Sequence, residues 1–271
     1  MGTPRDNPAR ARTLRELAER IEAVERKDAA HAGAVLTTEL PAPLASLALG
    51  VLHEWLCDDD GRAFRGRGRS LTPPLVIFAH LAHRALTAHE STSLVIWIGK
   101  HIWPTAHTLA CTQRGPDLLA HSLLVDPASD GERLWAIDLC LRSPAAAVVI
   151  ADASAMQLSH SRRLQLAAEA GASLALLARP NREQTTLSAA SMRWRVTRAR
   201  SPTHQPRWRI ERVRCKGVQR GKGMDADASL IVEHCRATGG LCVPADLADR
   251  SAEAPAATRA PLPGAGVRRT G

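Results

Sequence analysis

The sequence predicts an α/β fold with a mainly parallel sheet flanked by helices, followed by a C-terminal antiparallel hairpin. Three short runs, 94–98, 146–151 and 173–177, are apolar apart from Ser173, as strands covered on both faces of a sheet are. Segments of helical periodicity separate these runs, which is the alternation that a parallel sheet requires. Two later segments, 192–198 and 207–214, alternate polar and apolar residues around a proline-rich turn, which favours the hairpin.

Over residues 1–49 we expect an N-terminal helix followed by a linker. Residues 13–27 place apolar side chains at steps of three and four, which is the stripe of an amphipathic helix. Thr13 and Glu16 have the spacing of a capping box at its start. Pro41 and Pro43 then indicate a linker that leads into the main domain.

The main domain is expected over residues 50–217. Its strands are expected at 50–56, 94–98, 122–125, 146–151 and 173–177, and its helices at 73–87, 104–111, 130–142 and 159–170. The prolines at the start of the first of these helices are tolerated in a first turn. Residues 218–271 are polar, with an end rich in Ala, Pro and Arg, and this composition predicts a largely disordered tail.

The composition limits the classes of function. A net charge of +9 over 271 residues favours polyanions or acidic proteins as partners. The six cysteines form no C-x-x-C pair and the histidines lack a metal-ligand spacing, so no metal site and no Cys/His or Ser/His/Asp arrangement is predicted. With no signal peptide and no apolar run of membrane-spanning length, we expect a cytoplasmic protein, with association to the nucleoid as a further option.

The loop after the first strand carries a divergent phosphate-binding pattern at the edge where parallel sheets bind ligands. A P-loop reads G-x-x-x-x-G-K-S/T. Gly68, Arg69 and Ser70 stand where G-K-S is expected, but Ala63 replaces the first glycine and Asp58–Asp60 open the loop. Carboxylates beside a polyphosphate repel it. A solvated basic loop, a residual nucleotide site and a surface for a protein partner are the three interpretations.

Asp152 ends an apolar strand, as a Walker-B carboxylate does. Many parallel strands also end in an aspartate that caps the following turn or helix. From spacing alone, the capping interpretation is favoured.

The predicted hairpin is strongly basic. Between Arg193 and Lys222, eleven basic residues are opposed by Glu211 alone. Period-two geometry directs Trp194 and Trp208 to the core and the arginines outward. An exposed row of arginines suits phosphates or an acidic partner, while the alternative is an Arg-rich solvent face that blunts a sheet edge. The candidate binding residues are Arg193, Arg195, Arg207, Arg209, Arg212 and Arg214.

Over residues 13–217 the chain resembles the ImuA family, RecA-like accessory proteins of bacterial translesion-synthesis cassettes, formerly described as SulA-like. The resemblance rests on the order of six segments together with the paired R-W-R-V and P-R-W-R-I motifs. These segments are GVLHEWL (50–56), LVIWIGKHIWP (94–104), LWAIDLCLRSPAAAVVIAD (134–152), SHSRRLQLAAEAGASLALLARP (159–180), SAASMRWRV (188–196) and PRWRIERVRCKG (206–217).

The resemblance implies a RecA-like core with altered catalytic positions. Arg69 matches the P-loop lysine and Ser70 its hydroxyl partner, Lys100 matches the catalytic glutamate, and Asp152 matches the Walker-B carboxylate. A cation at the position of a general base cannot activate water. The implied protein is not an enzyme and needs no cofactor, although ATP with Mg²⁺ could still bind; the alternative is a divergent RecA-like ATPase that binds nucleotide and DNA.

The resemblance also implies a role in SOS-induced translesion synthesis and DNA repair. The implied partners are an ImuB-like Y-family polymerase homologue, an error-prone polymerase and RecA. Single-stranded DNA is a further candidate, since the basic segments would suit it. No membrane partner is expected.

Overall fold

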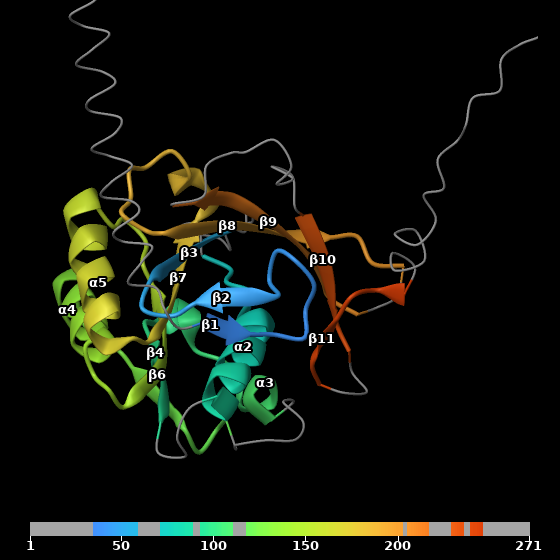
Figure 1. Cartoon of the computed structure of the whole chain (residues 1–271), viewed down its shortest axis with the longest axis horizontal. Helices are drawn as coiled ribbons and strands as arrows, with labels where there is room; N and C mark the ends of the chain where they lie inside the picture. The colour runs from blue at the N-terminus through green and yellow to red at the C-terminus, as the bar shows by residue number, and fades with distance from the viewer. Residues whose placement is uncertain are drawn as a thin grey trace, which may run out of the picture.

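A computed structural model describes residues 35–58, 71–88, 93–110, 118–202, 205–216, 229–235 and 239–245, and these residues form two sheets and the helices around them (Figure 1). The strands are β1 (Val35–Thr37), β2 (Ser46–Ala48), β3 (Leu52–Cys57), β4 (Leu94–Ile98), β5 (Ser122–Val125), β6 (Ala146–Asp152), β7 (Leu174–Pro180), β8 (Met192–Ala199), β9 (Arg207–Cys215), β10 (Ser229–His234) and β11 (Leu241–Cys242). The helices are α2 (Leu75–Ala88), α3 (Ala106–Ala110), α4 (Asp130–Leu141) and α5 (Leu158–Gly171), with single 3₁₀ turns η1 (Lys100–Ile102) and η2 (Asn181–Glu183). The predicted helix over 13–27 lies outside the described residues.

The larger sheet has nine strands within the described residues, in the order β11-β10-β9-β8-β3-β7-β6-β4-β5. From β8 to β5 all neighbouring strands are parallel, while β8, β9, β10 and β11 pair antiparallel in turn. The predicted α/β fold with a mainly parallel sheet and flanking helices is therefore confirmed. The two alternating segments pair with each other, but β8 also pairs parallel with β3, so they continue the main sheet.

The helices divide between the two faces of the sheet according to the direction of the chain. The chain runs outward from β3 to β4 and β5, and α2 and α3 on this path pack together on one face. It then returns through β6 to β7, and α4 and α5 pack side by side on the other face (Figure 1). Because crossovers between parallel strands are right-handed, reversing the direction of travel moves the connecting helices to the opposite face.

The two faces have different cores. Under α2 the core is aromatic, with Trp55 at 5.5 Å edge-on to Phe78 and at 5.6 Å stacked on Trp194. Under α4 and α5 it is built from alanine, leucine, isoleucine and valine, so these helices can approach the sheet closely. Gly171 ends α5 against α4, where a Cβ atom would overlap the carbonyl oxygen of Leu141.

Residues 35–49 belong to the folded domain, and their prediction as part of a linker was wrong. Strands β1 and β2 pair antiparallel as a small ribbon next to α2. Leu36, Leu40, Leu44 and Leu47 are buried and join the aromatic core. These leucines cover α2 on the side that the main sheet leaves open, which is why a proline-containing segment is ordered there.

Residues 229–242 also contradict the prediction of a largely disordered tail beyond residue 218. Strand β10 pairs with β9 and β11 pairs with β10. Leu230 and Val232 are buried in the aromatic core beside Trp208 and Ile210. The short alternation S-L-I-V-E-H was the signal for this strand, and its apolar side chains complete the core at the antiparallel end of the sheet. Among the described segments, every helix is too short or too polar to cross a membrane.

His53 is a fully buried histidine in the aromatic core. Its Nε2 lies 2.8 Å from the carbonyl oxygen of Ala48, and the indole N–H of Trp194 donates to Nδ1 at 3.3 Å. These two bonds fit only the neutral ring that carries its proton on Nε2. Burial lowers the pKa of His53 from 6.5 to about 4, although the bond to Ala48 acts in the opposite direction.

We expect the folded protein to lose stability as the pH falls through the range between the two pKa values of His53. The unfolded chain takes up a proton near pH 6.5, whereas the folded chain does so only near pH 4. From about pH 6.5 to about pH 5, this one group lowers the free energy of unfolding by roughly 1.5 kcal/mol. Urea denaturation at each pH should show a smaller fall for His53→Gln than for the wild type. Parallel pH profiles would contradict the assignment.

Candidate functional site

The parallel strands bring several of the candidate residues to one edge of the sheet. Asp58 follows β3, Gly99 follows β4 and Asp152 ends β6, and ligands of open α/β sheets bind beyond such carboxyl ends. Gly68, Arg69 and Ser70 lie outside the described residues. Lys100 opens the turn η1, and the structure describes its backbone but not its side chain.

Asp152 is buried and already engaged. Its Oδ1 accepts hydrogen bonds from the backbone N–H of Ser154 at 2.9 Å and from the Ser154 hydroxyl at 2.6 Å. Its Oδ2 lies 4.0 Å from the Nη1 of Arg133, which is itself held by Asp130 and by the carbonyl oxygen of Ser154. The carboxylate therefore organises the turn after β6, and a fixed cation stands beside the oxygen that a metal ion would use.

Gly99 lets the end of β4 approach this carboxylate. Its φ is +98°, a conformation that residues with a side chain rarely adopt, and a Cβ atom there would lie 3.1 Å from the Cβ of Asp152. The structure thus places Gly99, the residue before Lys100, against Asp152. The backbone of Lys100 and the side chain of Asp152, two positions matched to RecA in the sequence analysis, therefore lie at the same edge of the sheet. A glycine is required because both the backbone conformation and the close contact exclude a side chain.

The start of α2 differs from that of a phosphate-binding helix. Such a helix presents its first N–H groups to the phosphates. Here Pro73 and Pro74 lack this group, Leu75 N–H donates to the Pro73 carbonyl oxygen, and Ile77 N–H donates to the Pro74 carbonyl oxygen. The helix predicted over 73–87 begins two residues later, at Leu75, so both prolines precede it.

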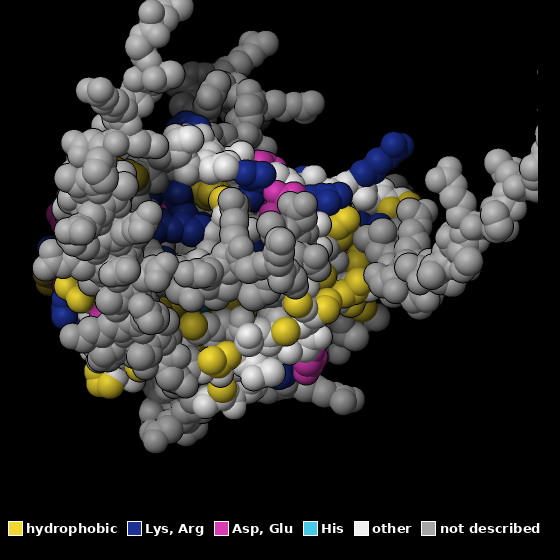
Figure 2. All heavy atoms as spheres, turned by 45° about the horizontal axis from the view of Figure 1, so that its top comes forward, with side chains coloured by type: hydrophobic (Ala, Val, Ile, Leu, Met, Phe, Trp, Pro, Cys, Tyr) yellow, Lys and Arg dark blue, Asp and Glu magenta, His cyan; other side chains and the backbone are white. Residues whose placement is uncertain are grey.

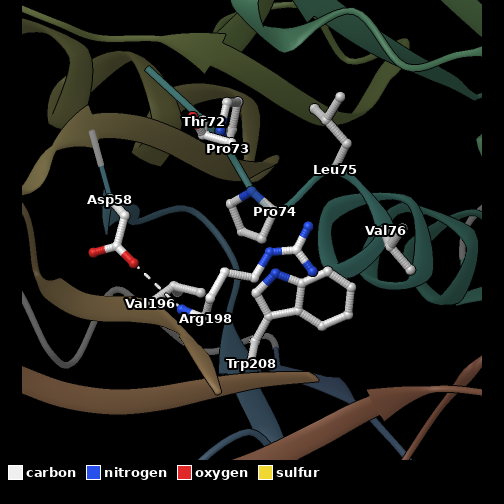
Figure 3. Close-up of a pocket in the computed structure, with 9 residues that line it drawn as sticks. All are labelled: Asp58, Thr72, Pro73, Pro74, Leu75, Val76, Val196, Arg198 and Trp208. Atoms are coloured by element: carbon white, nitrogen blue, oxygen red, sulfur yellow. Dashed lines mark hydrogen bonds between the residues drawn. The ribbon is translucent and has the colours of Figure 1, made fainter. Parts of the chain in front are cut away.

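A pocket of about 570 Å³ lies where α2 meets the end of β3 and the strands β8 and β9 (Figure 3). Pro74, Leu75, Val76, Val196 and Trp208 are among its apolar walls, and Asp58, Thr72 and Arg198 supply polar groups. The backbone N–H of Arg198 donates to Asp58 Oδ2 at 3.3 Å, and its guanidinium lies 4.8 Å from the centre of the Trp208 ring. The pocket therefore combines apolar and polar walls, and Arg198 is the cation among the residues that line it.

The tryptophans of the basic segments face the core, as predicted, but the predicted row of exposed arginines is wrong at two positions. Trp194 is fully buried and Trp208 is 6% exposed. Arg193 is only 6% exposed and Arg207 only 5%, because each is ion-paired, the first to Glu54 and the second to Glu233.

The other candidate arginines are neutralised to different degrees. Arg195 is half-buried and bound to Glu211 at 3.0 Å, and Arg214 is half-buried and donates to the carbonyl oxygen of Ser188. Arg212 is half-buried and Arg209 is exposed. In the view of Figure 2, acidic side chains lie next to basic ones near the top of the molecule.

The buried arginines lead to a network that the sequence analysis missed. The carboxylate of Glu54, in the middle of β3, accepts hydrogen bonds from the guanidinium of Arg179 in β7 at 3.0 Å and from that of Arg193 in β8 at 2.8 Å. It also accepts one from the hydroxyl of Ser188 at 2.5 Å. Arg179 also donates to Glu183 and to the carbonyl oxygen of Met156. The available signal was a carboxylate inside a predicted strand, since a glutamate is almost never buried without a partner.

We expect Arg193 and Arg209 to differ sharply in their contribution to stability. Arg193→Gln leaves the buried Glu54 carboxylate with one of its two cations and should lower the free energy of unfolding by about 3 kcal/mol. Arg209→Gln, on the exposed face, should change it by less than about 0.5 kcal/mol. Urea denaturation measures both variants. Equal effects of the two substitutions would contradict this account.

Comparison with known proteins leaves the family open. No protein-family model matches the chain. No curated protein matches it at a significant level either. Among the described residues, no three His, Cys, Asp or Glu side chains gather as a metal site would require.

Proposed function

We propose that this chain is a RecA-like accessory protein of SOS-induced translesion DNA synthesis and DNA repair, which binds protein partners and does not turn over ATP efficiently. The proposal takes its biological setting from the ordered segments that resemble the ImuA family. The α/β fold with a mainly parallel sheet is compatible with a RecA-like core. The claim that the chain does not turn over ATP efficiently rests on the residues at the carboxyl ends of the parallel strands, the edge of the sheet where a nucleotide would bind.

Three features of that edge disfavour ATP hydrolysis. At the start of α2 the prolines lack N–H groups, and those of Leu75 and Ile77 already donate to backbone carbonyl oxygens, which leaves fewer of them for a phosphate. Arg133 stands beside Asp152, where its charge competes with a divalent cation. Arg69 and Lys100 occupy the positions that match the P-loop lysine and the catalytic glutamate. Together these features act against phosphate binding, metal binding and water activation at one edge of the sheet.

The proposed partners are an ImuB-like Y-family polymerase homologue, an error-prone polymerase and RecA. Single-stranded DNA is a further candidate, which the exposed Arg198, Arg200 and Arg209 support. The buried Arg193 and Arg207 are excluded from such a surface because each is committed to a glutamate.

The accessory role predicts a direct complex with the polymerase homologue. We expect the purified full chain and an ImuB-like protein from the same genome to co-elute in size-exclusion chromatography at micromolar concentration. Bovine serum albumin, mixed with the chain at the same concentration, provides the control for non-specific association. Separate elution of the two proteins at these concentrations would contradict the accessory role.

The alternative, a divergent ATPase, is favoured by the burial of Asp152 at a strand end beside Gly99. We expect no phosphate release above the buffer control when the full chain is incubated with ATP, Mg²⁺ and single-stranded DNA. Asp152→Ala should therefore leave the measured rate unchanged. Steady turnover by the wild type that is abolished in Asp152→Ala would favour the ATPase instead.

A further inference from the structure

The pocket beside α2 is large enough for a short segment of a partner, and part of its wall is apolar. Its volume of about 570 Å³ falls within the range of ligand pockets. Val76 stands on the α2 side, while Val196 and Trp208 come from β8 and β9 (Figure 3). These elements belong to the folded core, so the walls are present before any ligand arrives.

Arg198 is the cation that this pocket offers to a ligand. It is exposed, and its guanidinium lies over the Trp208 ring instead of against a carboxylate. Within the described part of the chain it has no ion-pair partner, in contrast to Arg193, Arg195 and Arg207. The carboxylate of Asp58 accepts the backbone N–H of Arg198, and no ion pair between this carboxylate and the guanidinium is found among the described residues. Nothing in the ranges that the structure describes occupies the guanidinium as an ion pair, so it can receive an anion at the edge of this partly apolar pocket.

This combination fits a peptide better than it fits a nucleotide or a nucleobase. A polyphosphate would bring several negative charges next to Asp58, whereas a peptide carboxylate brings one. At the start of α2 the prolines have no N–H group, and the N–H groups of Leu75 and Ile77 already donate to backbone carbonyl oxygens. A nucleobase needs an open aromatic face, whereas Trp208 is buried in the core and Arg198 covers its ring. An apolar side chain next to a carboxylate matches both the walls and the free cation.

We propose that the pocket is a docking site for a segment of a partner protein in which an apolar side chain adjoins Asp or Glu. The apolar side chain fills the space between Val76, Val196 and Trp208, and the carboxylate pairs with Arg198. The assignment rests on the proposed function in one respect, namely that the chain binds proteins. It adds the place of binding and the chemistry of the bound segment.

The test is fluorescence anisotropy of the full chain with three labelled synthetic peptides of equal length. One alternates Leu and Asp, one alternates Leu and Lys, and one alternates Ser and Asp. We expect the Leu-Asp peptide to bind at least about tenfold more tightly than the other two. Arg198→Glu should weaken the Leu-Asp peptide about tenfold and make the Leu-Lys peptide the preferred one.

Arg200→Glu is the matched control, because it makes the same change of charge two residues away, at an exposed position that does not line the pocket. It should change the affinity for the Leu-Asp peptide less than about threefold. Circular dichroism confirms that both variants are folded. Equal binding of the three peptides, or equal losses in the two variants, would overturn the assignment.

Unlabelled oligo(dT) is added as a competitor to separate a peptide site from a nucleic-acid site. We expect it to leave the bound Leu-Asp peptide in place. Displacement that is lost in Arg198→Glu but retained in Arg200→Glu would assign the pocket to single-stranded nucleic acid and overturn the proposal. If the polymerase homologue binds the chain but the three peptides bind equally, the pocket assignment fails and the accessory role stands. If the Leu-Asp peptide binds selectively but the polymerase homologue does not bind, the pocket assignment stands and the accessory role fails.

Discussion

The buried carboxylate of Glu54 is the constraint on which the centre of the structure depends. It lies in β3 and binds Arg179 from β7 and Arg193 from β8, so a single charge links three neighbouring strands. A buried charge is tolerated only when it is paired and hydrogen-bonded, and each partner here must sit at one register. Through Arg179 the network also reaches Glu183 and the turn before α5, which fixes the loops at the carboxyl edge.

These ion pairs reduce the positive charge that the arginine-rich segments present to a partner. A segment that is dense in arginine along the sequence becomes a surface of mixed charge, because glutamates from β3, β9 and β10 come to lie against it. The free positive charge then concentrates on side chains outside these pairs, Arg198 among them. A count of basic residues therefore overstates the electrostatic attraction that this face can exert on a polyanion.

The sequence predicted the parallel strands well and the terminal ribbons poorly. Strand β4 was predicted residue for residue, because an apolar run covered on both faces has clear ends. Strand β1 is three residues long, and prolines follow it, so local pattern favoured a linker. The alternation of side chains along a strand predicted correctly that Arg193 lies on the face opposite Trp194. It could not predict the ion pair with Glu54, because Glu54 lies 139 residues away in the chain. The pocket at Trp208 was equally hidden, since it depends on β9 lying beside the start of α2.

The two prolines before α2 have a consequence for the design of a phosphate site at this edge. Exchanging Arg69 for lysine would supply the residue type of a P-loop, but Leu71–Pro74 would still stand between residue 70 and the start of the helix at Leu75. The prolines carry no N–H group, and the N–H groups of Leu75 and Ile77 are already donated to backbone carbonyl oxygens. Building a phosphate site here would therefore require changes to the backbone before α2 as well as a change of side chain.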